Sequence, residues 1–135
     1  MKIKVTNERG DDGSSGAYIS SDNAPFGSVG DGKSVQETKD DFINSYEEMK
    51  LYYSENSKKF TECDFEFSYD IASFLAYYGK ILSLAGMERL TGVNQGQLSH
   101  YVTGHRKPSK KTIEKIEKKL HAFGNELNQI EFARS

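Results

Sequence analysis

The chain has 135 residues and a formal net charge of −2, enough length for one ordinary domain or two very small ones. No apolar run approaches the roughly 18 residues that cross a bilayer, and residues 1–5 lack the apolar core of a secretory signal. Cys63 is the only cysteine, which excludes an internal disulfide and fits a reducing compartment, so we expect a cytoplasmic protein without membrane contact.

Charge is unevenly divided along the chain. Residues 1–67 hold 8 Lys and Arg against 14 Asp and Glu, a net charge of −6, whereas residues 68–135 hold 10 against 6, a net charge of +4. The basic half is suited to phosphates and the acidic half to a basic protein, which favours two separate binding tasks. Two solvated surfaces that differ by chance would give the same counts.

The first half of the chain predicts three short strands, one long helix and a fourth strand. Alternating residues predict strands at 2–8, 17–21, 28–30 and 64–69, and a polar glycine-rich turn at 10–16. Ser34 and Glu37 form a capping box that begins a helix ending near Asn56. Its expected buried stripe is Val35, Thr38, Phe42, Ile43, Tyr46, Met49 and Tyr53. We therefore expect an α+β fold with a small antiparallel sheet, covered on one side by one helix.

From Asp70 onward the pattern changes to short helices. Asp70 can cap the first, residues 81–91 make the second and Asn94 can cap the third. Pro108 and Ser109 open the fourth, which Gly124 would end. Residues 127–132 fit either a strand or an ordered tail. The sequence thus predicts two domains, residues 1–69 and an all-α domain of residues 70–135.

Two of these helices have the spacing of a helix-turn-helix. Gly92 suits the tight turn, Val93 would be buried and Asn94 would cap the next helix. In such a unit the first turns of the second helix enter the major groove, where amide, hydroxyl and imidazole groups can bond to base edges. The base-reading residues expected here are Asn94, Gln95, Gln97, Ser99 and His100.

Basic residues follow this helix directly. They lie on the loop after it and on the start of the next helix, where side chains commonly contact DNA phosphates and so set the register. The phosphate-binding residues expected here are His105, Arg106, Lys107, Lys110 and Lys111. A helical packing unit with a polar surface is the alternative interpretation.

Residues 81–124 resemble the lambda-repressor-like (XRE) helix-turn-helix family. The turn glycine Gly92, the polar start Asn94-Gln95 and the segment Gly104-His105-Arg106-Lys107-Pro108-Ser109 carry the resemblance. Glu88 stands where the family packs alanine between the two helices, so we expect it to reach solvent and loosen the helix crossing. Gly96 also departs, because the family offers a reading side chain there.

Residues 1–69 resemble the N-terminal domain of HicB antitoxins. The segment Gly27-Ser28-Val29-Gly30-Asp31-Gly32-Lys33-Ser34, followed by Val35 and Glu37, matches the signature that leads into that domain's long helix. The resemblance implies a truncated RNase H-like fold and a type II antitoxin. It further implies neutralisation of a small basic ribonuclease (a HicA-like toxin) by direct binding, and repression of the protein's own operon at its operator as a dimer or higher homo-oligomer.

Catalytic and metal-binding patterns are weak in this chain. The three histidines lack partners at metal-ligand spacing, and Cys63 has no basic neighbour that would activate it, so we expect no enzyme, metal or cofactor. An RNase H-like nuclease would need clustered carboxylates around two metal ions. The candidates are Asp22, Asp31, Asp40, Asp41, Glu66 and Asp70. A stand-alone transcriptional regulator with a ligand- or protein-sensing N-terminal domain is the main alternative to an antitoxin, and a nuclease is the third hypothesis.

Overall fold

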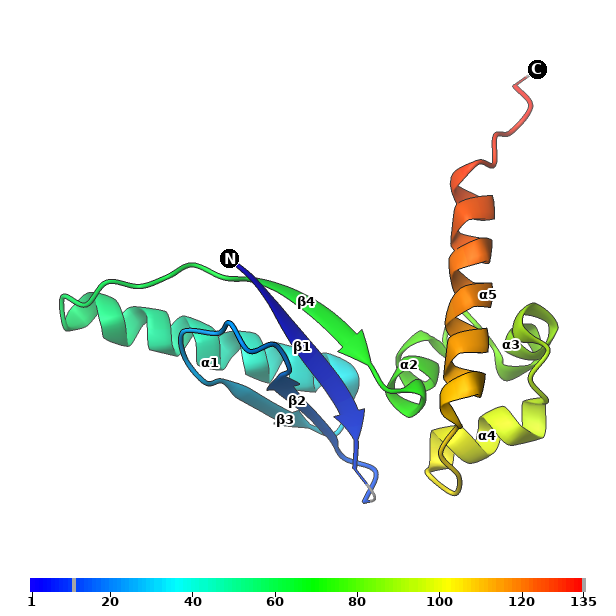
Figure 1. Ribbon diagram of the computed structural model, residues 1–135, viewed down its shortest axis with the longest axis horizontal. Coiled ribbons are helices and arrows are strands. Elements are labelled where there is room, and N and C mark those ends of the chain that lie inside the picture. Colours follow the sequence, from blue (N-terminus) through cyan, green and yellow to red (C-terminus); the bar gives the residue numbers. More distant parts are fainter. Residues whose placement is uncertain (11, 135) are drawn as a thin grey trace. The chain divides into compact units, whose positions relative to one another are not determined.

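The computed structural model describes residues 1–10 and 12–134. Three strands, a long helix and a fourth strand are followed by four helices, in the order expected from the sequence (Figure 1). The elements are β1 (Lys2–Arg9), β2 (Ser15–Ile19), β3 (Val29–Gly32), α1 (Val35–Glu55), β4 (Asp64–Tyr69), α2 (Ile71–Tyr78), α3 (Leu84–Thr91), α4 (Gln95–Thr103) and α5 (Lys110–Asn128). Residue 11 of the expected turn and residue 135 lie outside the described residues. The α+β class is confirmed.

The sheet is mixed and has the strand order β3-β2-β1-β4. β2 is antiparallel to both of its neighbours, but β1 and β4 run parallel, so the expectation of a purely antiparallel sheet is wrong at this pair. The reason is the connection: α1 crosses one face of the sheet between β3 and β4, and such a crossover returns the chain in the parallel direction (Figure 1).

The first core lies between α1 and the sheet. Ile3 and Val5 of β1 are fully buried, and Phe42 of α1 packs edge-on against Phe65 and Phe67 of β4, with ring centroids 5.0 and 6.0 Å apart. The expected helix stripe is confirmed at four buried positions, which are Val35, Thr38, Phe42 and Tyr46. Ile43 is 38% exposed instead, because it follows Phe42 directly and lies about 100° around the helix from it.

Two glycines let α1 lie against the backbone of β3. A Cβ atom on Gly30 would stand 2.5 Å from the carbonyl oxygen of Thr38 and 2.8 Å from the amide nitrogen of Phe42. A Cβ atom on Gly32 would stand 2.9 Å from the amide nitrogen of Thr38. The glycines of the 27–34 motif therefore set the distance between helix and sheet.

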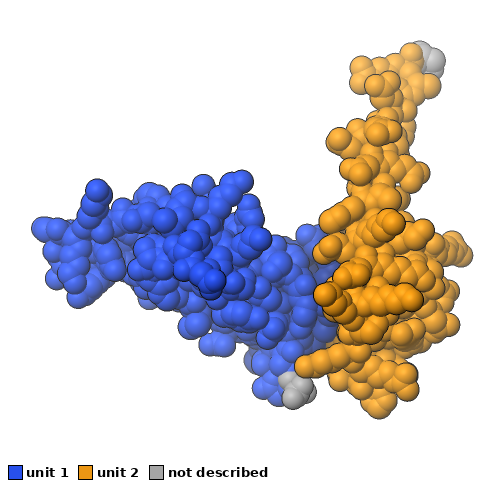
Figure 2. Space-filling model, in the orientation of Figure 1, with its two compact units in different colours: residues 1–78 blue, residues 79–135 orange. Residues whose placement is uncertain are grey.

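Helix α2 belongs to the first of two compact units, which span residues 1–78 and 79–135 (Figure 2). The carboxylate of Asp70 accepts hydrogen bonds from the backbone N–H groups of Arg9 at 3.0 Å and Ser73 at 2.8 Å, which ties the start of α2 to β1. The rings of Tyr69 and Tyr77 stack at 5.7 Å. The boundary between the two compact units therefore follows Tyr78 and not Tyr69, the boundary expected from the sequence.

The second unit is a bundle of α3, α4 and α5 around a small core. Its fully buried apolar side chains are Met87, Leu98 and Ile116. Helix α3 begins at Leu84 because Ser83 caps it, and α5 continues past Gly124 to Asn128. Residues 129–134 form no regular secondary structure, so the chain end is not a strand. Within the described part of the chain, no helix combines the length and the apolar character that a membrane span requires.

Candidate nucleic-acid interface

The turn between α3 and α4 is held by one buried hydroxyl group. Gly92 ends α3 in the left-handed conformation with φ 76°, which favours glycine. The Thr91 hydroxyl donates to the carbonyl oxygen of Met87 at 2.7 Å and accepts from the amide of Val93 at 3.1 Å. Val93 is buried, as expected. The Thr91 hydroxyl thus connects the last turn of α3 to the residue that follows Gly92.

Two side chains cap the start of α4. Asn94 accepts hydrogen bonds through Oδ1 from the backbone N–H groups of Gly96 and Gln97, at 2.8 and 3.4 Å. Glu88 of α3 accepts a third, from the amide of Gln95 at 2.8 Å. Glu88 is half-buried rather than extended into solvent, and it joins the two helices directly.

The expected base-reading residues divide into free and engaged side chains. Gln95 and His100 are exposed, and Ser99 is half-buried. Gln97 is exposed too, but its amide donates to the hydroxyl of buried Tyr101 one turn later, so one of its two groups is already used within α4. Asn94 uses its carbonyl oxygen as a cap and keeps only its NH₂ group for other partners.

The exposed face of α4 extends further than its first turns. Gly96, His100 and Thr103 recur at four- and three-residue spacing, and all three are exposed. The His100 ring packs edge-on against the ring of His105, with centroids 4.9 Å apart, so the loop residue extends this face. Thr103 is not among the residues expected from the sequence, because it lies at the end of α4 and not in its first turns.

The five expected phosphate-binding residues are all exposed, and none makes an ion pair within the described part of the chain. Lys110 and Lys111 form the first turn of α5, which Ser109 caps by accepting from the amide of Thr112 at 3.2 Å. Positive charge is unfavourable at this end of a helix unless an anion is close. The arrangement therefore suits a bound phosphate.

Lys115 is a further basic residue near the interface that is not among those expected from the sequence. A Cβ atom on Gly92 would stand 3.5 Å from its Nζ atom, which places the ammonium group at the turn between α3 and α4. Its position four residues after Lys111, on the same side of α5, is the only signal in the sequence.

A capped, exposed polar helix beside unpaired basic side chains defines a helix-turn-helix unit of the DNA-binding class. A helix-turn-helix family model matches residues 80–121, and this match assigns the region as an XRE-like helix-turn-helix domain. It supports a DNA-binding transcriptional regulator. The match covers less than half of the chain and does not extend to the sheet. Comparison with curated proteins and with solved structures found no match.

Proposed function

We propose that this protein is a HicB-like antitoxin that also represses its own operon. The first unit, as a truncated RNase H-like domain, covers the RNA-binding or catalytic face of a small basic HicA-like ribonuclease. The second unit binds operator DNA. The protein has no catalytic role in this proposal, and it works in the cytoplasm, where its toxin and operator lie.

The opposite charges of the two units carry the proposal. Residues 1–78 hold 8 Lys and Arg against 15 Asp and Glu, a net charge of −7, and residues 79–135 hold 10 against 5, a net charge of +5. An acidic unit attracts a basic protein and repels nucleic acid, whereas a basic unit does the reverse. One chain therefore carries a protein-binding part and a DNA-binding part.

Base reading is assigned to the exposed side of α4. Gln95 can bond in bidentate fashion to adenine, and Ser99 and His100 can donate to or accept from base edges. Asn94 and Gln97 act mainly through the groups that their bonds within the helix leave free. The basic loop and the start of α5 hold the phosphates.

A dimer is part of the proposal, because one recognition helix reads only one half-site and two half-sites lie about 34 Å apart. The apolar residues of α5 and the following segment recur at three- and four-residue spacing beyond the core of the unit. They are Leu120, Phe123, Leu127 and Ile130. Leu127 and Ile130 are both 50% exposed, which supports a second copy of the chain as their partner.

The experiment separates DNA recognition from toxin neutralisation with one double variant. The full chain is expressed with the gene beside its own, and a promoter fragment of that operon is compared with a scrambled fragment in binding assays. Gln95→Ala with Gln97→Ala should abolish the preference for the promoter fragment and leave toxin neutralisation unchanged. Loss of neutralisation in this variant would contradict the division of labour. A neighbouring gene product that neither binds nor is neutralised would leave a stand-alone regulator.

A further inference from the structure

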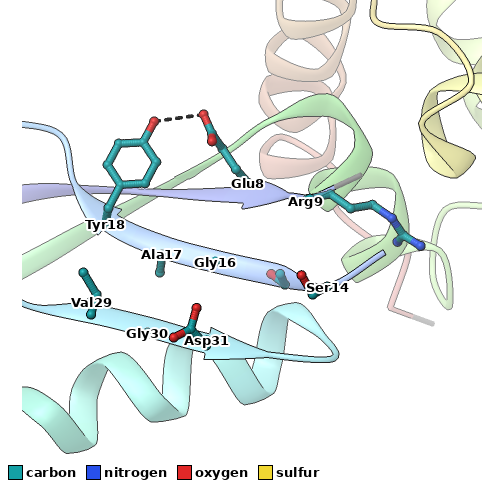
Figure 3. Close-up of a pocket in the computed structure, with 11 residues that line it drawn as sticks. Glu8, Arg9, Ser14, Gly16, Ala17, Tyr18, Val29, Gly30 and Asp31 are labelled. Atoms are coloured by element: carbon teal, nitrogen blue, oxygen red, sulfur yellow. Dashed lines mark hydrogen bonds between the residues drawn. The ribbon is translucent and has the colours of Figure 1, made fainter. Parts of the chain in front are cut away.

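The outer face of the sheet, opposite α1, carries a pocket of about 400 Å³ that helix-turn-helix function does not use. It is lined by the ends of β1 and β2, by Gly10 and Ser14 between them, and by β3 (Figure 3). Its floor is Gly16, where an added Cβ atom would meet nothing closer than a carbonyl oxygen 4.0 Å away. The middle of this sheet face is therefore open.

Two carboxylates stand on either side of that floor. Gly16 is the register partner of Glu8 on β1 and of Asp31 on β3, so the three residues form one row across the sheet. Neighbouring strands lie about 4.8 Å apart, which places the two acidic residues roughly 9.6 Å apart at the backbone. Neither carboxylate makes an ion pair within residues 1–10 and 12–134.

Tyr18 forms one wall and holds one of the carboxylates in place. Its hydroxyl donates to Oε1 of Glu8 at 2.9 Å, and its side chain is 41% exposed (Figure 3). Arg9, which also borders the pocket, points away from both carboxylates in the same view. The pocket thus offers two acceptors and an aromatic ring to a cation from outside.

The number of ligands selects the kind of cation. A small metal ion needs several oxygen ligands at about 2.0–2.6 Å, and two carboxylates alone do not supply them. The described residues also contain no group of three or more potential metal ligands. A guanidinium group is flat, carries donors on several edges and stacks on aromatic rings. It can donate to both sides at about 2.8 Å while it lies over the glycine.

We propose that this pocket is a docking site for an arginine side chain of a basic partner protein. The guanidinium lies over Gly16 and donates to Glu8 and Asp31, with the ring of Tyr18 beside it. The identity of the partner as the toxin rests on the proposed function. The affinity of the pocket for a guanidinium group does not, and it can be measured alone.

The test is an NMR titration of the full chain with N-acetyl-arginine methylamide. The control ligand is the corresponding citrulline derivative, which has nearly the same shape but no charge. The arginine derivative should give saturable shifts centred on the amides of Gly16, Tyr18 and Asp31. The citrulline derivative should bind at least about tenfold more weakly, since charge-assisted hydrogen bonds are roughly twice as strong as neutral ones.

Variants make the assignment specific. Glu8→Gln combined with Asp31→Asn should weaken arginine binding at least about tenfold. Asp64→Asn, which neutralises one carboxylate on the same sheet face outside the pocket, should leave binding unchanged. Gly16→Val fills the floor with a residue that strands favour, so it should abolish binding without lowering the melting temperature. Equal binding of both ligands, or full binding by Gly16→Val, would overturn the proposal.

The outcomes also distinguish a failure of the pocket proposal from a failure of the proposed function. A Gly16→Val chain that still neutralises the toxin as well as the wild type would remove the pocket from that contact and leave the proposed function intact. If no toxin is found, the titration still decides whether the pocket binds a guanidinium group.

Discussion

Gly30 illustrates how a single residue sets the packing of a whole helix. Gly30→Ala would place a methyl group against backbone atoms of α1, which cannot rotate away. We expect a loss of about 1–3 kcal/mol in the free energy of unfolding, the usual cost of overpacking. Thermal or urea denaturation would measure it. Gly27→Ala, at a position with nothing within 4 Å, is the control and should leave stability nearly unchanged.

The contact between Glu62 and α1 predicts a dependence of stability on pH. A hydrogen bond from Lys50 lowers the pKa of Glu62 below its ordinary 4.5, and the same bond raises the pKa of Lys50 above 10.5. Tyr46 links the same carboxylate to the chain before β4, because its hydroxyl donates to Glu62 and accepts from the amide of Cys63.

The direction of each pKa shift determines how the stability of the fold changes with pH. A lowered carboxyl pKa stabilises the fold above about pH 4.5, and this stabilisation is lost as the pH falls through the folded-state value. The Lys50 contribution is lost at the opposite end, as the pH rises above 10.5. Glu62→Gln should therefore lower the melting temperature slightly at pH 7 but not at pH 3. An equal decrease at both pH values would contradict the charged contact.

At the scale of elements, most of the secondary structure could be predicted, because residues at the helix ends themselves determine where the helices begin and end. Ser34, Asn94 and Ser109 each accept a backbone hydrogen bond as a cap, and Gly92 and Gly104 each end a helix with positive φ. The parallel pairing of β1 with β4 could not be predicted, because it joins segments about sixty residues apart and depends on where α1 crosses.

The candidate DNA interface was predictable to a similar extent. The capped start of α4 and the basic residues after it follow from short motifs, and the helix-turn-helix match agrees with them. The hydrogen bond that the backbone N–H of Gln95 donates to Glu88 does not follow from a short motif, because it spans two helices and seven residues. The hydrogen bond from the Gln97 amide to the Tyr101 hydroxyl could not be predicted either, because the sequence does not indicate which partner an exposed glutamine side chain takes.

The first turn of α5 gives a prediction in which stability and binding change in opposite directions. Replacing Lys110 and Lys111 by alanine removes positive charge from the positive end of a helix dipole, so the melting temperature should rise slightly. Loss of two phosphate contacts should weaken binding to all DNA sequences and lower the slope of log K against log[salt] by about 1.8.

Lys118→Ala with Lys119→Ala is the matched control, because it removes the same charge beyond the first two turns of the same helix. Its effect on the salt slope should be clearly smaller. Loss of affinity for one sequence alone in the Lys110 and Lys111 variant would assign these lysines to base reading instead.

At the scale of the whole molecule, the exposed end of α5 connects oligomeric state to DNA recognition. Leu127→Asp places a charge in the apolar stripe outside the core of the unit, so the monomer should still fold. If a second copy covers this stripe, the dissociation constant of the dimer should rise at least about tenfold. Sedimentation would detect the change, and binding to a two-half-site operator should weaken with it, while binding to a single half-site should not.

Asn128→Asp is the control, because it adds the same charge one residue away and should leave both dimerisation and operator binding unchanged. A wild-type chain that sediments as a monomer at concentrations that saturate the operator would require another surface to bring the two recognition helices together.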